Sequence, residues 1–423
     1  MTIFRCLYTC LCLWAVSPGV LPAQTEPPAE PEVIALPLAL RRAVENDPRM
    51  GLNAALADAA QGQVEQADLP PNPVIGGEAE NFLGTGPITG VQGLELTLGI
   101  SQVIETADKR ARRTTLARRE RDLVDWQREL LVAEVEAEVR AAFVDVLLAQ
   151  ELVTLRARQL DLARQSETET ARLVEAARSP QLDLTRATLA ARRQTYALEQ
   201  AQRELATAKA NLAVLWGEGS FSDFEVEGSV VLEPEVPSFG ELAAMLPNTA
   251  ELARYEALRK TREAALDLEK ARAVPDFEIY AGGRYYNEDN GNFGFVAGFE
   301  IPWPLFDRNQ GNIRTARAQV RAVEYEREAL RRELLTSLHR AYQVLVSAHA
   351  EAISVQADLL PGAEQALADT SAGYERGQYT QLAVLESRQT FFEIREASLV
   401  ALQRYAAAQA QIQALTRPAG LSY

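Results

Sequence analysis

The sequence predicts a mainly α-helical protein with a four-stranded β contribution, built from two internal repeats. Three observations carry this prediction. Segments of the first half recur in the second half, each about 200 residues further along the chain. Apolar residues spaced three and four positions apart run over unusually long stretches, which indicates long helices. Four shorter stretches instead alternate apolar and polar side chains, which is typical of strands with one apolar face.

The N-terminal residues predict export. Residues 1–23 read as a signal peptide, because Arg5 precedes the apolar run "CLYTCLCLWAV", which is too short to span a bilayer as a helix. All three cysteines of the chain (Cys6, Cys10 and Cys12) lie in this run, and none has room upstream for a full apolar region, which disfavours a lipid-modified cysteine. Residues 24–35 are Pro-rich and predicted to be extended. No later run of 18 apolar residues predicts a transmembrane helix.

The repeats set the domain organisation. "ARSPQLDLTRA" parallels "GQYTQLAVLES", and "LGISQVIETADKRAR" parallels "AGFEIPWPLFDRNQGNIR". Each repeat, 36–216 and 239–416, therefore reads helix, strand, strand, long helix, tight turn and return helix. A Gly-, Ser-, Pro- and acid-rich linker (217–238) joins them, and a short tail (417–423) follows.

The long helices are predicted over 107–178 and 311–375, with coiled-coil spacing. The second carries an extra four-residue step from Leu334 to Leu338, which predicts a local stutter there. In the first, the predicted seam consists of Leu116, Leu123, Leu130, Ala137, Val144 and Leu152. The return helix (about 181–216) and the helix before the strands (about 36–68) are each short enough to stack end to end against it. An ordinary bundle of shorter helices is the alternative.

The strands are predicted over about 73–83, 93–103, 276–287 and 292–303, lengths that cross a bilayer when tilted. Their apolar faces are rich in aromatic and aliphatic residues, and the residues predicted to face lipid are Leu94, Leu96, Leu98, Phe293, Phe295, Phe299 and Trp303. A small soluble sheet packed on a helix is the alternative. Unpaired strand edges in lipid are costly, and four strands cannot close, so the chain must then oligomerise. Two protomers supply 8 strands, three supply 12 and four supply 16; three is the smallest number that leaves a conduit.

Other chemistry finds no support in the sequence. The net charge of −16 and the lack of a basic block argue against nucleic acid as a partner. His339 and His349 do not share a helix face, and no cysteine follows the signal peptide, so no metal site is expected. No phosphate loop and no nucleophile–base–acid set stands out. We therefore expect neither an enzyme nor a bound cofactor.

With the repeats, strands and long helices together, the chain resembles the TolC family of outer-membrane efflux proteins, over essentially its whole length after the signal peptide. Within that family it is similar to the cobalt–zinc–cadmium branch that serves heavy-metal efflux pumps. The stretches that carry the likeness are "PPNPVIGGEAENFLGTG", "LTLGISQVIETADKRARR" and "PWPLFDRNQGNIRTARAQV".

The resemblance implies a homotrimer with a 12-stranded barrel in the outer membrane and a helical tunnel extending into the periplasm. Its tips would dock a periplasmic adaptor, which links it to a proton-driven inner-membrane pump of the RND type. The channel itself would be a passive duct without a cofactor. Drugs or a secreted polypeptide are alternative cargoes. A non-conducting periplasmic coiled-coil scaffold is an alternative of another class.

The resemblance also implies a periplasmic gate at the two helical turns. Asp183 falls where the family places a gate acid in the first turn, Tyr374 matches a gate tyrosine in the second, and Glu386 matches an acidic position of the entrance ring. The chain departs from the family at two positions: Ala383 replaces the other ring acid, and Tyr379 stands where an arginine can tie the gate shut. The alternative is that Asp183 and Glu386 are solvated charges near helix ends.

Overall fold

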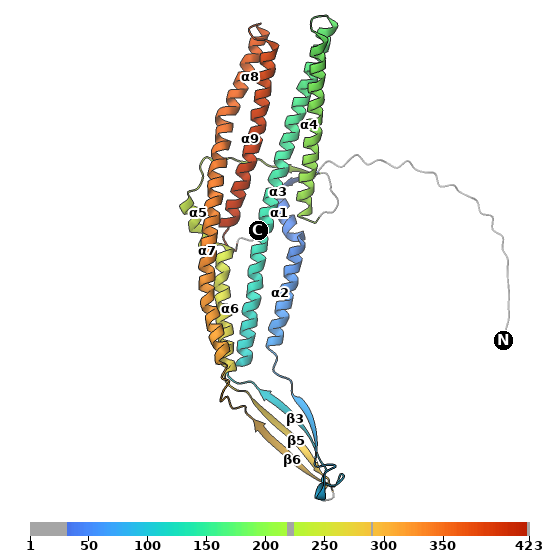
Figure 1. Cartoon of the computed structure of the whole chain (residues 1–423), viewed down its shortest axis with the longest axis vertical. Helices are drawn as coiled ribbons and strands as arrows, with labels where there is room; N and C mark the ends of the chain where they lie inside the picture. Colours follow the sequence, from blue (N-terminus) through green and yellow to red (C-terminus); the bar gives the residue numbers. More distant parts are fainter. Residues whose placement is uncertain (1–31, 218–223, 289–290, 421–423) are drawn as a thin grey trace, which may run out of the picture.

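The computed structural model describes residues 32–217, 224–288 and 291–420. Within them helices dominate and two small sheets are present, which confirms the predicted mainly α-helical class. The helices run along most of an elongated molecule, and the four-stranded sheet lies at one end of it (Figure 1). The predicted signal peptide and the first part of the predicted extended segment (24–31) lie outside the described residues.

The two halves of the chain have the same order of elements. The first contains α1 (Leu36–Asn46), α2 (Pro48–Ala67), β2 (Val74–Glu80), β3 (Glu95–Ile104), α3 (Lys109–Glu175) and α4 (Gln181–Val214). The second contains α5 (Phe239–Met245), α6 (Ala250–Arg272), β5 (Phe277–Tyr286), β6 (Asn292–Glu300), α7 (Gln310–Ile353), α8 (Leu360–Glu375) and α9 (Gln381–Thr416). Helix α3 has 67 residues and is about 100 Å long at 1.5 Å per residue. Helices α2 and α4 both pack on α3, one towards the sheet and the other towards the tip (Figure 1).

The predicted single helix over 311–375 is interrupted. A π-helical stretch (Ser354–Leu359) separates α7 from α8. Pro361 follows it, and a proline ring has no N–H and collides with the carbonyl four residues earlier, which breaks the regular α-helical bonding. The four-residue step predicted at Leu334–Leu338 lies within regular helix, and both residues are buried, as are Ala341 and Leu345 after them. Likewise, the helix predicted over 36–68 is divided at Asp47, directly before Pro48.

In α3 the predicted seam was slightly misplaced. The six residues predicted to form it are only half-buried. The fully buried stripe runs beside them and contains Val132, Val135, Val139, Phe143 and Val146. All of these residues except Val132 belong to one cluster with residues of α1 and α4, and an equivalent cluster joins α7 to α9 in the second half.

The four strands form one antiparallel sheet in the order β2-β3-β5-β6. The two hairpins meet where β3 pairs with β5, with Leu98 opposite Gly283. Because directly opposed residues share a face, the register puts one set of side chains on the first face: Ile75, Leu96, Leu98, Ile100, Ile279, Tyr285, Phe293, Phe295 and Phe299. The other face carries Glu78, Glu80, Glu95, Thr97, Glu278, Arg284 and Glu300.

Two residues predicted to be lipid-facing strand residues lie outside the strands. Leu94 immediately precedes β3 and is half-buried. Trp303 lies beyond the end of β6 at Glu300, since Pro302 has no N–H to donate to a ladder. The Trp303 side chain is nevertheless 80% exposed.

A second sheet was not predicted. Strand β1 (Glu32–Ala35) pairs in parallel with β4 (Phe224–Glu227), which lies in the linker between the repeats. Ile34, Phe224 and Trp216 are buried beneath it. This small sheet fastens the start of the described chain to the linker near the middle of the molecule.

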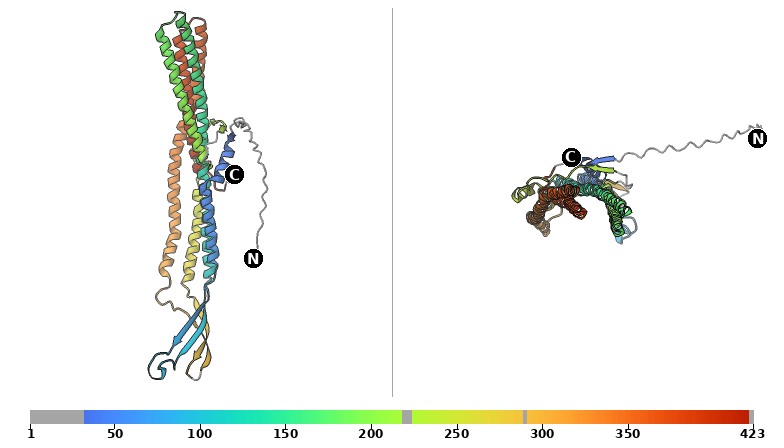
Figure 2. Two further views of the ribbon diagram at one scale, coloured as in Figure 1. Left: turned by 90° about the vertical axis from the view of Figure 1, so that its right-hand side faces the viewer. Right: turned by 90° about the horizontal axis from the view of Figure 1, so that it is seen from above.

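Seen along its long axis, the protomer is a curved wall rather than a closed ring (Figure 2). The first-half helices form one part of the arc and the second-half helices the other. The halves meet where α3 contacts α6 and α9.

Asp47 fixes the break between α1 and α2. Its Oδ1 accepts a hydrogen bond of 2.7 Å from the Arg49 N–H, which caps α2. The Arg49 guanidinium also reaches Glu138 of α3 at 2.6 Å. The hydrogen bond from the Arg49 side chain holds the pKa of the buried Asp47 carboxyl below its ordinary value, against the effect of burial.

We expect Asp47→Ala to lower the free energy of unfolding by about 1–2 kcal/mol at pH 7, because a helix cap and an ion pair are lost. A lowered folded-state pKa gives stability that is fully present above the unfolded-state pKa, about 3.9, and is lost as pH falls through the folded-state value. The difference from wild type should therefore shrink between pH 4 and more acidic conditions. Urea unfolding followed by circular dichroism measures it. Asp58→Ala, which removes an exposed carboxylate from the same helix, is the control, and an equal loss there would contradict the assignment.

Candidate channel surfaces

The two turns between long and return helices lie together at the end of the molecule opposite the sheet (Figure 1). They have the same backbone. After α3, the Arg178 N–H bonds the Leu173 carbonyl and Ala177 has a φ of 54°. After α8, the Gln378 N–H bonds the Gly373 carbonyl and Gly377 has a φ of 72°. Each is a Schellman-type end, and the equivalent residues are 200 positions apart.

Asp183 lies in the first turn of α4. The Ser179 hydroxyl donates a 2.8 Å hydrogen bond to its Oδ2, and the Arg186 guanidinium lies 4.0 Å from its Oδ1. The carboxylate side chain is 44% exposed. Asp183 therefore bonds groups of its own turn and still faces solvent.

The second turn carries the other three predicted gate residues. Tyr374 and Tyr379 are 46% and 53% exposed, and Glu386 is exposed one turn into α9. The ring of Tyr379 lies directly on Gly373, where an added Cβ would come within 2.3 Å of the ring. Tyr379 thus packs against the last turn of α8 within its own hairpin. In the described part of the chain, no hydrogen bond or ion pair joins the first turn to the second.

The sheet offers two chemically different surfaces. On the apolar face Phe295 is 92% exposed and Phe299 is 72% exposed. On the polar face the Arg284 guanidinium reaches Glu80 at 3.0 Å and Glu95 at 2.9 Å, and it donates 2.8 Å to the Thr97 hydroxyl. The charges of the polar face are thus linked across three strands, whereas the aromatic face has nothing covering it in the protomer.

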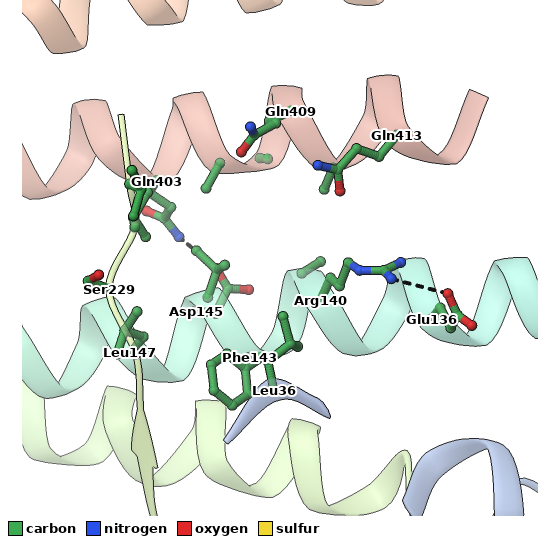
Figure 3. Close-up of a pocket in the computed structure, with 18 of the residues that line it drawn as sticks. Leu36, Glu136, Arg140, Phe143, Asp145, Leu147, Ser229, Gln403, Gln409 and Gln413 are labelled. Carbon is green, nitrogen blue, oxygen red and sulfur yellow. Dashed lines mark hydrogen bonds and ion pairs between the residues drawn. The ribbon is translucent and has the colours of Figure 1, made fainter. Parts of the chain in front are cut away.

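A cavity of about 1110 Å³ lies midway along the molecule, between α3, α9 and the linker residues 227–233 (Figure 3). Several polar side chains of its lining contact each other. Arg140 and Arg417 both bind the buried carboxylate of Glu136, at 3.2 and 3.0 Å, and Gln403 donates 2.9 Å to Asp145. These contacts join the first repeat to the second and to the chain after α9. We therefore assign the cavity to the junction of the repeats.

Within the described ranges, no group of three or more His, Cys, Asp or Glu side chains could hold a metal ion. Both histidines have structural contacts. The Nε2 atom of the buried His349 lies 2.7 Å from the Glu233 carbonyl oxygen, and the His339 ring packs edge-on against Phe239. No helix of the described chain is both long and apolar enough to cross a membrane.

Comparison with known proteins decides the family. The chain is 30% identical over 389 residues to the cobalt-zinc-cadmium resistance protein CzcC of Cupriavidus metallidurans, covering 90% of this chain and 91% of that protein. The chain belongs to the outer membrane efflux protein family. The family description "Outer membrane efflux protein" matches residues 242–416, which is most of the second repeat.

A further sequence relative and a solved structure are also similar to the chain. The nickel-cobalt-cadmium resistance protein NccC of Alcaligenes xylosoxydans is 28% identical over 303 residues, or 70% of this chain and 66% of that protein. The crystal structure of the channel protein CusC has the same fold, with a TM-score of 0.69 at 17% identity over 90% of this chain and 91% of that one. Proteins of the outer membrane efflux protein family are outer-membrane transport channels and not enzymes, so the predicted location and the predicted lack of catalysis are confirmed.

Sequence reasoning missed the junction of the repeats. Glu136 is a buried acid within an otherwise apolar stripe of α3, and this interruption was the available signal. Its partner Arg417 lies 281 positions away in the short C-terminal tail, where no local pattern indicated a contact.

Proposed function

We propose that three copies of this chain form a passive outer-membrane duct that exports heavy-metal cations. One observation carries the assembly: a four-stranded sheet with an uncovered aromatic face, a polar face and two unpaired edges, in a member of an outer-membrane family. Three such sheets joined edge to edge make a 12-stranded barrel, whose apolar side meets lipid and whose polar side lines the conduit.

In this arrangement the side chains facing lipid are Leu96, Leu98, Phe293, Phe295 and Phe299. Leu94 and Trp303 flank the strands at the barrel ends, where Trp is favoured at the level of the lipid headgroups. Glu300 and the Arg284 cluster face the conduit. The helices continue the conduit as a tunnel into the periplasm. Three protomers, each curved as Figure 2 shows for one, would complete the ring.

The proposed partners rest on the likeness to the family, and the tips, at the end of the molecule opposite the sheet, are where they would dock (Figure 1). A periplasmic adaptor docks there and connects the duct to a proton-driven inner-membrane pump of the RND type. Since the duct is passive, energy comes from that pump, and the chain itself needs no cofactor. Asp183, Tyr374, Tyr379 and Glu386 form the periplasmic entrance in this proposal.

The metal cargo rests on the relatives. CzcC and NccC are named for resistance to cobalt, zinc, cadmium and nickel, and the first covers nearly the whole chain. Drug efflux and polypeptide secretion through the same duct are the second candidate, because pump and adaptor select most of the cargo.

Deleting the gene tests the cargo. We expect the deletion strain to become more sensitive to Co²⁺, Zn²⁺ or Cd²⁺ and to keep its resistance to unrelated toxic organic compounds. The minimal inhibitory concentrations of both classes measure this, with the wild-type gene restored on a plasmid as control. Sensitivity to organic compounds alone would reassign the duct to drug efflux.

We expect Phe295→Lys to block barrel insertion, since a lysine facing lipid near mid-depth costs about 2–4 kcal/mol. Val296→Lys is the matched control, because the neighbouring residue points to the polar face and a charge there remains hydrated. Membrane fractionation followed by unheated gel electrophoresis measures assembled trimer. Equal trimer yields for the two variants would favour the periplasmic scaffold.

We expect Glu386→Ala to reduce the cation-to-anion permeability ratio by a factor of about two, because three copies of this carboxylate surround one axis at the entrance. The effect should be larger in 0.1 M than in 1 M KCl, since salt screens the ring. Reversal potentials in planar bilayers measure the ratio. Glu364→Ala, which removes an exposed carboxylate from α8, is the control. A ratio unchanged by Glu386→Ala at low salt would remove this residue from the entrance.

A further inference from the structure

We propose that an arginine-lined hollow on the outer side of α7 binds the phosphate headgroup of an anionic phospholipid, at the level where the proposed barrel leaves the membrane. The hollow has a volume of about 650 Å³ and lies at the start of α7. Its lining consists of Arg308, Gln310, Ile313, Arg314, Arg317 and Arg321. The inference rests on the proposed membrane position of the sheet, and it adds a binding site to the proposed duct.

The charge of this region is opposite to that of the whole chain. The protein has a net charge of −16, yet residues 301–321 contain four arginines and one acid, Asp307. All four arginines are exposed. Within residues 32–217, 224–288 and 291–420, none of the four has an ion-pair partner. Like charges that line one hollow without an acidic partner repel each other, so the hollow favours an anion.

The acids of the adjoining segments bond other groups. Asp307 Oδ1 accepts a 2.9 Å hydrogen bond from the Asn309 N–H. Glu269 of α6 accepts 2.6 Å from the Asn309 side chain and pairs with Arg272 at 2.6 Å. Helix α7 has no acidic residue in its first turn, so the N–H groups of that turn add to the positive potential.

The arginines face the outside of the curved wall. Arg314 and Arg317 are three positions apart and share one face of α7. They lie 25 residues, or about seven helical turns, before His339 and Tyr342. Both of these later rings pack against Phe239 of α5. Seen along the long axis, α5 lies outside the arc of the long helices (Figure 2). In the proposed trimer the arginines therefore face away from the conduit.

An uncovered apolar segment precedes the arginines. Between β6 and α7, Trp303 is 80% exposed, Leu305 is 60% exposed and Phe306 is 90% exposed. This segment lies where the sheet meets the helices (Figure 1), which in the proposed membrane position is the level of the lipid headgroups. Tryptophan favours that level, and arginine side chains near it extend towards the phosphates. Apolar side chains followed by arginines thus match the acyl chains and the phosphate of one phospholipid.

Lipid binding tests the site. Phosphatidylglycerol is added at increasing concentration to the full-length chain in detergent, and native mass spectrometry measures the bound lipid. The double variant Arg314→Gln with Arg317→Gln should need at least about fivefold more lipid for half occupancy, because each basic residue near an anionic headgroup adds to the attraction. Arg327→Gln with Arg340→Gln removes two exposed arginines further along α7 and should bind lipid as wild type does.

A competitor separates a lipid from a free anion. Excess inorganic phosphate at constant ionic strength should leave the lipid on the wild-type chain, because inorganic phosphate has no acyl chains to contact the apolar segment at Trp303. Displacement of the lipid by inorganic phosphate would overturn the assignment to phospholipid.

The remaining outcomes separate this site from the proposed function. Equal occupancy in the two double variants, with trimers intact, would overturn the lipid site and leave the duct standing. Dissociation of only the Arg314→Gln, Arg317→Gln trimer in lipid-free detergent would show that these arginines contact the partner subunit, which would also overturn the lipid site. A wild-type chain that fractionates as a soluble monomer would overturn the proposed function itself.

Discussion

In the proposed barrel, the structure depends on one constraint, which is the hydrogen bonding of strand edges in a bilayer. Water cannot satisfy backbone N–H and C=O groups within the hydrocarbon region, and each unpaired group costs several kcal/mol there. The protomer leaves β2 and β6 as edges of a sheet with an exposed aromatic face. In the proposed membrane position a single copy would leave both edges unpaired in lipid, so the proposed function requires assembly. Because the long helices follow directly after the strands, the proposed assembly of the sheets would bring the helices of the copies together as well.

The internal repeat reduces the number of such edges, because its two hairpins form one sheet. The pairing of β3 of the first half with β5 of the second joins the two hairpins and leaves β2 and β6 as the edges of the sheet. Polar contacts add to the pairing of β3 with β5. Lys109 of α3 binds Asp276 at 2.7 Å just before β5, and the Thr106 N–H donates 2.7 Å to the same carboxylate. These contacts hold the hairpins of one chain together where the sheet meets the helices.

The sequence predicts those parts of the fold that repeat a local pattern. Alternation identified all four strands of the large sheet, and the spacing in α7 identified buried residues such as Leu338 and Leu345. It could not locate the π-helical stretch, because the apolar spacing continues through it and Val355 remains buried there. Pro361 was the available signal. Strand β1 could not be predicted as paired, since four residues bond a strand almost 200 positions away. At the tips, the resemblance to the family identified exposed residues in both turns. It could not predict their contacts, such as the packing of the Tyr379 ring against Gly373.

The two tips show how a repeat can keep its backbone and change its chemistry. Both turns end in the same hydrogen-bonded form, with Ala177 and Gly377 in equivalent left-handed positions. Yet Asp183 corresponds to Ala383, and Arg186 corresponds to Glu386, so the acid moves from one position of the turn to another. In the proposed trimer the six turns would share one backbone conformation. Their acids, however, would lie at different positions in alternate turns, at Asp183 in one and at Glu386 in the next. The first turn retains an acid beside its own arginine, which weakens its field, whereas Glu386 has no such neighbour among the ion pairs of the described residues. The field at the entrance would then come chiefly from the second turn, which is why a single carboxylate per chain can dominate the selectivity of the ring.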